Sequence, residues 1–226
     1  SPDPRLNYLF DWSVIGRNAD KFAAGLGLSL GMAAAALIGG SILGLLVAYA
    51  RLARSPLIRV PAAAYVELMR NTPLLLLVVF MYFGLPEIGI YFLEKIESFI
   101  LTLGLYAAAY MSEVFRAGLA SMPRQYAEAA KAIGMRPWQR QRYVVLPVML
   151  RMVLPAAANN LISLFKDTSL ATAIAVPELT FVARQVNANT FRVMESWLTA
   201  SALYLGTCLL ISTVLRLIER RYAMVR

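Results

Sequence analysis

Four consecutive polar residues interrupt an apolar stretch in the second half of the chain. Lys166 and Asp167 carry opposite charges, and Thr168 and Ser169 follow them with two hydroxyl groups. A zwitterionic ligand could bind such a set, because charge-assisted hydrogen bonds are strong where the dielectric constant is low. The structural alternative is a Lys–Asp pair that neutralises itself and holds neighbouring helices together.

A second set of charges lies in another apolar stretch. Glu67 and Arg70 are three residues apart, so on a helix they can face each other as a pair. Thr72 and Pro73 follow closely, and the proline removes one helical hydrogen bond. Ionisable groups inside a membrane are costly and by default functional, although a neutral pair near the cytoplasmic end of a span would be purely structural.

The segments that carry these charges are long and apolar enough to cross a membrane. Of 226 residues, 59% are hydrophobic and only 15% are charged, which argues against an ordinary soluble domain. A helix rises about 1.5 Å per residue, so the uncharged residues 22–50 exceed the roughly 30 Å hydrocarbon core. The same argument predicts five spans, at residues 22–50, 62–84, 96–119, 151–176 and 196–217. The predicted fold class is therefore an all-α integral membrane protein.

Two pairs of glycines lie four residues apart in the first predicted span. They are Gly27 with Gly31 and Gly40 with Gly44. Small residues at this spacing let two helix backbones approach closely, so both pairs predict helix packing.

The net charge of +9 is explained by where the cations lie. Most lysines and arginines occur after the first predicted span, between the third and fourth spans, and at the C-terminus. The positive-inside rule then predicts an external N-terminus and a cytoplasmic C-terminus. With the predicted spans, the chain then divides into an external or interfacial segment (1–21), one transmembrane domain (22–219) and a cytoplasmic tail (220–226). No soluble basic domain remains that could bind nucleic acid.

The scarcity of cysteine and the absence of histidine exclude several kinds of chemistry. The chain contains one cysteine, Cys208, and no histidine. A disulfide within the chain, histidine-based metal sites and Ser-His or Cys-His nucleophiles are therefore excluded, and we expect no metal site. The first twenty residues lack a basic region followed by a short apolar core, so no cleavable signal peptide is expected.

The longest cytoplasmic connection, at about residues 120–150, is predicted to form two short helices. Apolar side chains recur at helical spacing from Tyr126 to Ile133. Gly134 is placed to end this helix, and Pro137 favours the start of the next. The spacing is equally typical of a solvated amphipathic loop that lies on anionic lipid.

This connection resembles the EAA loop of binding-protein-dependent ABC importer permeases. The resemblance rests on Glu128-Ala129-Ala130, on Gly134, and on Val144 and Leu146-Pro147 at fixed offsets. In that family the loop forms a coupling helix that docks into a groove of the nucleotide-binding subunit. The resemblance implies that Glu128, Ala129, Ala130 and Gly134 contact a separate ATPase. This chain lacks a phosphate-binding loop, so we expect no cofactor and no enzyme activity here, with ATP and Mg held by the partner.

Three further segments resemble the polar amino-acid uptake branch of these permeases. They are Phe10-Asp11-Trp12-Ser13, the run from Tyr65 to Leu74, and Lys166-Asp167-Thr168-Ser169-Leu170. The resemblance covers nearly the whole chain and implies a type I ABC importer permease fold in the bacterial inner membrane. It also implies a second permease subunit, either the same chain or a homologous one, two ATPase subunits, and a periplasmic or lipid-anchored binding protein.

The resemblance leads to a hypothesis for substrate contacts. Arg70 or Lys166 would meet the α-carboxylate of an amino acid, and Asp167 its α-amino group. Thr72, Thr168 and Ser169 would supply hydrogen bonds. Whether the substrate is acidic, basic or an amide is not specified by these residues.

Two other functions could use the same charges. A passive channel or an ion-coupled carrier would need no nucleotide partner, but the motif from Glu128 to Pro147 argues against both, because neither requires a docking helix. A membrane-embedded enzyme is the weakest alternative, because the chain has no histidine and one cysteine within a predicted span.

Overall fold

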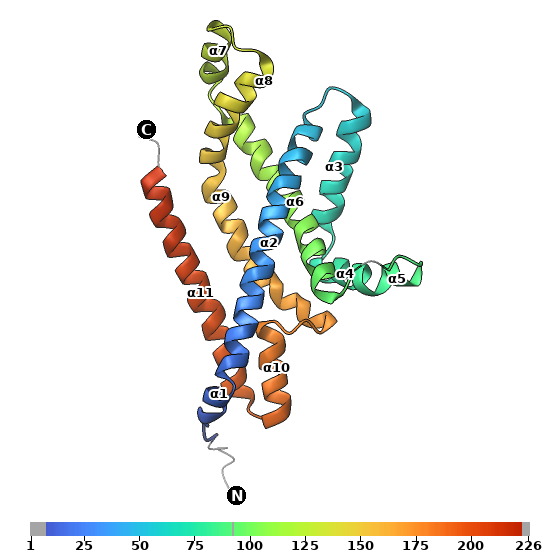
Figure 1. Ribbon diagram of the computed structural model, residues 1–226, viewed down its shortest axis with the longest axis vertical. Helices are drawn as coiled ribbons and strands as arrows, with labels where there is room; N and C mark the ends of the chain where they lie inside the picture. The colour runs from blue at the N-terminus through green and yellow to red at the C-terminus, as the bar shows by residue number, and fades with distance from the viewer. Residues whose placement is uncertain (1–7, 92, 223–226) are drawn as a thin grey trace, which may run out of the picture.

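The computed structural model describes residues 8–91 and 93–222, and it is helical throughout these ranges apart from short connections (Figure 1). Side chains are described as far as residue 217. The elements in chain order are α1 (Ser13–Arg17), α2 (Ala19–Arg51), α3 (Pro56–Asn71), α4 (Leu74–Val79), the π-helix η1 (Phe80–Gly84), α5 (Leu85–Glu87), α6 (Lys95–Ser121), α7 (Arg124–Ala132), α8 (Pro137–Arg140), the π-helix η2 (Gln141–Val145), α9 (Leu146–Asp167), the 3-10 helix η3 (Thr168–Ile174), α10 (Leu179–Thr190) and α11 (Val193–Tyr222).

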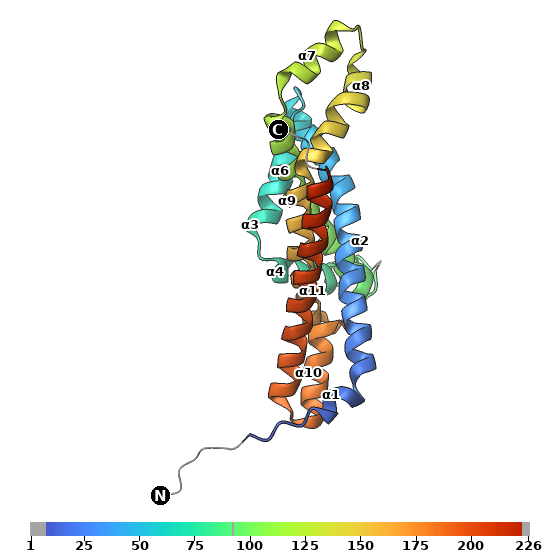
Figure 2. The ribbon, with the colours of Figure 1, turned by 90° about the vertical axis from the view of Figure 1, so that its left-hand side faces the viewer.

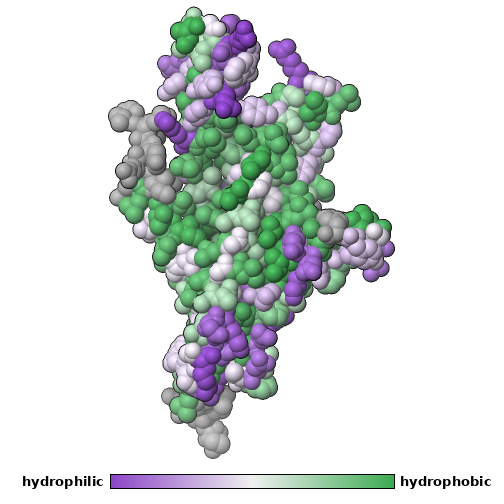
Figure 3. Space-filling view, viewed as in Figure 1, coloured by the Kyte–Doolittle hydropathy of each residue, from purple (hydrophilic) through white to green (hydrophobic). Residues whose placement is uncertain are grey.

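The all-α membrane fold predicted from the sequence is confirmed. Within the described residues four helical stretches are long and apolar enough to cross a membrane, and a fifth results if the bent pair α3 and α4–α5 is counted as one span. Figure 3 shows an apolar middle between more polar ends. The fourth stretch runs over Pro137–Ile174, so it begins well before the predicted start at residue 151.

The second predicted span is bent, in line with the disturbance expected at Pro73. α3 ends at Asn71, α4 begins at Leu74, and the two axes are bent by 107°. Pro73 has no N–H to donate and forces the preceding residue out of the helical region, and Thr72 is accordingly extended, with φ −104° and ψ 131°. α4, η1 and α5 therefore project sideways from the bundle (Figure 1).

α2 and α6 make the most extensive helix contact of the described chain. A Cβ built on Gly40 would lie 2.7 Å from the Ala107 Cβ, and one on Gly44 would lie 2.8 Å from the Ala108 carbonyl oxygen. The packing predicted for this glycine pair is therefore confirmed. A Cβ on Gly27 or Gly31 would meet nothing within 4 Å, so the same prediction is wrong for that pair within this chain.

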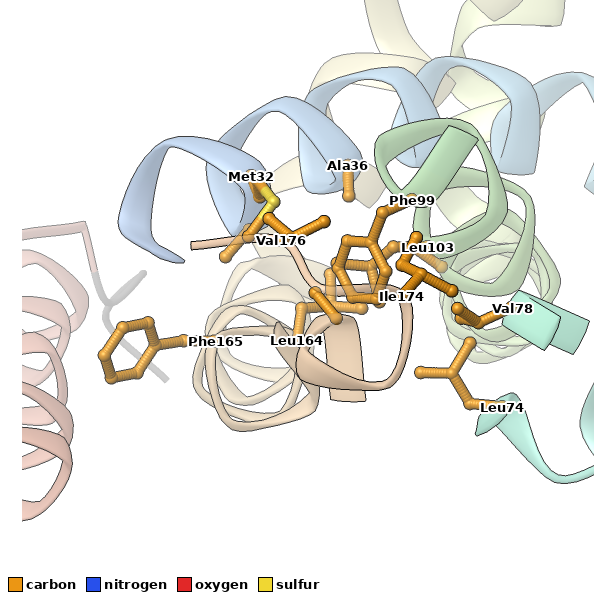
Figure 4. Close-up of a cluster of buried hydrophobic side chains, with 13 residues drawn as sticks. Met32, Ala36, Leu74, Val78, Phe99, Leu103, Leu164, Phe165, Ile174 and Val176 are labelled. Carbon is orange, nitrogen blue, oxygen red and sulfur yellow. The ribbon is translucent and has the colours of Figure 1, made fainter. Parts of the chain in front are cut away.

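A buried apolar cluster holds α2, α4, α6, α9 and η3 together (Figure 4). Its largest members are Met32, Leu74, Val78, Phe99, Leu103, Leu164, Phe165, Ile174 and Val176. Lipid tails are as apolar as these side chains, so close van der Waals packing contributes more here than exclusion of water. The cluster fixes the start of α4 against η3, and thus brings the bend of the second span next to the end of the fourth.

The sequence interpretation missed α10, which packs against α2 and α11 (Figure 2). Leu179, Val182, Ala183 and Val186 are buried, at the spacing of one helix face. The fully buried Glu178 caps the helix: its carboxylate accepts hydrogen bonds from the backbone N–H groups of Thr180 (2.8 Å) and Phe181 (2.7 Å) and from the Tyr204 hydroxyl (3.0 Å). An acidic residue before apolar residues at helical spacing was a readable signal for this helix.

The N-terminal segment is tied to the start of α11 by Glu195, which is fully buried. Its carboxylate accepts hydrogen bonds from the Asp11 backbone N–H (2.7 Å) and from the Tyr8 hydroxyl. The rings of Phe10 and Trp12 are exposed and stacked on each other with centroids 5.6 Å apart. Aromatic rings of this kind are typical of a membrane–water interface.

Candidate functional site

The motif from Glu128 to Gly134 lies on α7 and its C-terminal cap, at one tip of the molecule (Figure 1). Gly134 has φ +78°, a left-handed conformation that favours glycine. The Gly134 N–H donates to the Lys131 carbonyl (3.0 Å) and the Met135 N–H to the Ala130 carbonyl (3.1 Å). These two bonds form a Schellman motif, so the predicted glycine cap is confirmed and the helix end is rigidly closed.

The two faces of α7 differ. Ala130 is buried and borders a groove of about 620 Å³, whose other lining residues are Pro123, Gln125, Tyr126, Ala129, Ile133, Met135 and Val144. Glu128 is exposed and does not line this groove. α7 therefore presents a charged side chain to its surroundings while an apolar face remains largely uncovered.

The second short helix predicted in this connection does start at Pro137, but it is not separate. α8 continues through η2 into α9, so a single helical path leads from residue 137 to Asp167. The Arg136 N–H donates to Gln139 Oε1 (2.8 Å) and fixes the start of this path. The motif on α7 is therefore linked through Met135 and Arg136 to the helix that ends in Lys166 and Asp167.

Lys166 and Asp167 are the last residues of α9, and η3 begins directly after them. Lys166 is exposed, while Asp167 and Ser169 are half-buried. Thr168 is fully buried, and its hydroxyl donates to the Phe165 carbonyl oxygen (2.6 Å). In this conformation three of the four polar residues are accessible, and the Thr168 hydroxyl is occupied by the backbone.

The pair that the spacing of Glu67 and Arg70 allows does not form in this structure. Glu67 Oε2 instead accepts a hydrogen bond from Asn71 Nδ2 (3.0 Å). Arg70 turns to α6, where its Nη1 lies 3.6 Å from Glu113 Oε1 and its guanidinium 5.5 Å from the centre of the Tyr110 ring. The contact with the aromatic face contributes about 0.5–1 kcal/mol at such an exposed site.

α6 lies next to both sets of candidate substrate contacts, the set around Arg70 and the set around Asp167. Tyr106 and Tyr110 are four residues apart, and the Tyr106 hydroxyl donates to the Tyr110 hydroxyl (3.0 Å). Arg70 lies over Tyr110, and α9, which ends in Asp167, packs against α6. α6 is thus a common neighbour of α3, which carries Arg70, and of α9, which ends in Asp167.

Glu113 is a charged residue that the sequence interpretation missed. Its Oε1 pairs with Arg51 Nη1 (2.5 Å), and its Oε2 accepts from Arg116 Nη2 (2.7 Å) and Nε (3.0 Å). With Arg70 it therefore joins α2, α3 and α6. An ionisable side chain within the predicted third span could have marked Glu113 as important. Its partners could not be predicted, because they lie up to 62 residues away in sequence.

The candidate residues thus form two groups. Residues at the α3–α4 break and at the α9–η3 junction approach each other through the cluster of Figure 4. Residues of the α7 motif lie apart from them at the tip (Figure 1). Among the described residues no group of three or more His, Cys, Asp or Glu side chains could hold a metal ion.

Comparison with known proteins gives consistent matches along the chain. Residues 40–224 match the family described as binding-protein-dependent transport system inner membrane component. The chain is 31% identical over 216 residues to a probable amino-acid ABC transporter permease protein, YckA, of Bacillus subtilis, with 96% of this chain and 95% of that protein covered. It is 34% identical over 213 residues to the glutamine transport system permease protein GlnP of Escherichia coli, covering 94% and 97%.

Solved structures agree with the sequence matches. The structure described as an amino acid ABC transporter with histidines superposes with a TM-score of 0.87 at 28% identity and covers 95% of this chain and 100% of that one. A chain of the MetNI methionine ABC transporter in an inward-facing conformation has a TM-score of 0.77 at 22% identity, covering 93% and 99%, and supports the fold alone.

Proposed function

The chain belongs to the family of binding-protein-dependent transport system inner membrane components, and from this premise we propose that it is the permease subunit of an ATP-driven importer of polar amino acids. Such a chain forms the translocation path and is not itself an enzyme. Relatives named for glutamine, nopaline and octopine transport support an amino-acid substrate or a derivative of one.

The observation that carries the proposal is the geometry of α7. Its motif residues end in a closed Schellman motif, and two residues later a continuous helix leads to Lys166 and Asp167. We assign Glu128, Ala129, Ala130 and Gly134 to contact with a separate ATPase subunit that binds ATP and Mg. When that partner closes on ATP, the tilt of α7 would pass into α8–α9, because only the four residues 133–136, closed by the Schellman motif, separate the two helices.

For the substrate we propose contacts near the α9–η3 junction. The α-amino group and the carboxylate of an amino acid are attached to one carbon, so both must be met at nearly the same level of the path. Lys166 is therefore assigned to the carboxylate and Asp167 to the amino group, with Ser169 as a hydrogen-bond partner. Thr168 supports this junction from inside, through its bond to Phe165.

Arg70 and Thr72, which lie at the end of α3 and in the break after it, are assigned to another part of the path. Arg70 is half-exposed beside Tyr110 and Glu113, and Thr72 lies in the extended break before Pro73. We propose that they meet the side chain of the substrate or the substrate in transit. Alternating access then requires that the site bind the substrate more tightly in the outward-facing state than in the inward-facing one.

The family of the chain also suggests its partner subunits, and the distribution of its cations suggests its orientation. We propose two copies of an ABC ATPase, a second permease subunit that is this chain or a homologue, and a periplasmic or lipid-anchored binding protein. The distribution of lysine and arginine supports an external N-terminus and a cytoplasmic C-terminus in the bacterial inner membrane. In this orientation α7 would face the ATPase.

Co-purification and uptake test the proposal. The chain is extracted in detergent after co-expression with the ABC ATPase and binding protein of its source, and is then reconstituted into liposomes. We expect a stable complex and ATP-dependent uptake of at least one member of a panel of acidic, amide and basic amino acids. A chain that never associates with an ATPase, or that conducts without ATP, would instead be an ion-coupled carrier or a passive channel.

A further inference from the structure

A cavity with basic walls lies between the end of α2, the first turns of α3 and the second half of α6. Its volume is about 470 Å³. The lining residues are Arg51, Arg59 and Arg116, Glu67, and the small apolar residues Val60, Ala63 and Ala64. None of these residues belongs to the α7 motif or to the proposed substrate contacts.

Glu113 orients two of the three arginines that face this cavity. Arg51 gives only Nη1 to Glu113, and Arg116 gives Nε and Nη2. A guanidinium group has five N–H donors, so both arginines keep donors for a ligand while their planes are held in place. Arg59 is exposed and forms no ion pair with another described residue, so its N–H donors are available to a ligand.

The depth of the cavity relative to a membrane is set by α2. Arg51 is the last residue of α2, and the 29 residues that precede it, 22–50, contain no charge. Arg51 therefore lies where the hydrocarbon core ends and the lipid headgroups begin. Val60, Ala63 and Ala64 extend along α3 from this level and form an apolar wall.

We propose that this cavity binds the phosphate of an anionic phospholipid, with the arginines around the phosphate and one acyl chain along Val60, Ala63 and Ala64. Arginine is suited to phosphate because its planar fork donates two parallel hydrogen bonds. Basic pockets between membrane helices attract anionic headgroups in the cytoplasmic leaflet. Only the choice of leaflet rests on the proposed orientation of the chain.

Glu67 limits what can bind. Its carboxylate lines one wall, and its Oε2 accepts the hydrogen bond from Asn71, toward the end of α3. Glu67 and Glu113 place two negative charges beside the three arginines, so the site keeps one positive charge, which matches the single negative charge of a phosphodiester. The site therefore favours a phospholipid such as phosphatidylglycerol over a zwitterionic lipid, whose ammonium group would face the arginines.

Native mass spectrometry of the full chain, purified with its partner subunits, tests the proposal. The complex is exchanged into mixed micelles of phosphatidylglycerol or of phosphatidylcholine, and the lipids that remain bound are counted. We expect phosphatidylglycerol to be retained and phosphatidylcholine not. Arg59→Gln should weaken retention roughly fivefold, from about 1 kcal/mol for one basic residue near an anionic membrane surface.

Two further variants distinguish lipid binding in this cavity from a general effect of positive charge. Arg54 lies between α2 and α3 but does not line the cavity. The Arg54→Gln variant should therefore retain lipid like the unmodified chain. Ala63→Leu fills the apolar wall without a change of charge and should reduce retention. Equal retention in all four proteins overturns the proposal, and displacement by millimolar inorganic phosphate overturns the assignment to lipid. Uptake is not measured here, so failure of the transport proposal would leave this result intact.

Discussion

Arg51 and Glu113 form an ion pair of 2.5 Å that joins the last residue of α2 to α6. Only 14% of the Arg51 side chain and 21% of the Glu113 side chain are exposed, so neither charge has full access to water. Arg116 and Arg70 depend on the same carboxylate. Its loss would leave three arginines without their common partner.

Glu113→Gln should therefore lower the stability of the purified protein by about 1–3 kcal/mol, the cost of leaving a buried polar group unsatisfied. Thermal unfolding in a fixed lipid–detergent mixture measures the change. Glu97→Gln removes an exposed acidic side chain from the same helix and should leave the unfolding temperature unchanged. Equal effects of the two substitutions would show that the ion pairs contribute nothing.

Glu128→Ala should abolish uptake and weaken association with the ATPase, because the exposed carboxylate of α7 would be lost while the fold of the helix remains. Delivery of substrate by the binding protein should be unaffected. Lys131→Ala, which also removes an exposed charge from α7, serves as the control and should retain most uptake. Transport at the unmodified rate by Glu128→Ala would disprove the coupling role.

Asp167→Ala should reduce uptake by roughly tenfold or more, since a hydrogen bond to a charged group contributes about 1.5–3 kcal/mol. Assembly with the ATPase should stay normal, as measured by gel filtration of the complex. Glu87→Ala removes an exposed acid on α5 and should transport normally. If Asp167→Ala fails to assemble, the residue instead holds neighbouring helices together.

Gly40→Ala should destabilise the chain by about 1–3 kcal/mol, the usual cost of overpacking. The new Cβ would lie 2.7 Å from the Ala107 Cβ and 2.9 Å from the Gly104 carbonyl oxygen. Gly31→Ala is the matched control on the same helix, because its Cβ meets nothing within 4 Å and helix propensity improves. The two unfolding temperatures should move in opposite directions, and a shared direction would contradict the proposed contact.

Glu178→Ala should lower the unfolding temperature, because two N–H groups of α10 and the Tyr204 hydroxyl lose their acceptor. Loss of a helix cap costs about 0.5–2 kcal/mol. Tyr204→Phe removes only one of these hydrogen bonds and should have a smaller effect. An effect of Tyr204→Phe as large as that of Glu178→Ala would show that the cap itself contributes little.

The spans and the α7 motif could be predicted from the sequence because they depend on local properties. The length of an apolar run predicts a span, and Gly134 predicts a left-handed cap without knowledge of any neighbour. The direction in which Arg70 turns could not be predicted, since it depends on α6, whose Tyr110 and Glu113 lie about 40 residues later. The spacing of three residues on one helix had suggested Glu67 as the partner of Arg70 instead.

The bend at Pro73 was predictable only in part. Proline predicts a disturbed helix, but the angle of 107° depends on the packing of Leu74 and Val78 against η3. The start of α9 was placed too late for a related reason. A span was expected to begin where the charges end, whereas η2 and α8 continue the helix beyond the apolar stretch.

The glycine contact between α2 and α6 has a consequence for motion. Where two backbones touch, as at Gly40 and Gly44, the helices have no flexible side chains between them that could adjust to sliding. α2 and α6 should therefore move together as one stationary frame. The sharp break at Thr72–Pro73, where the helix axis bends by 107°, is then the place where we expect α4 and α5 to turn against this frame.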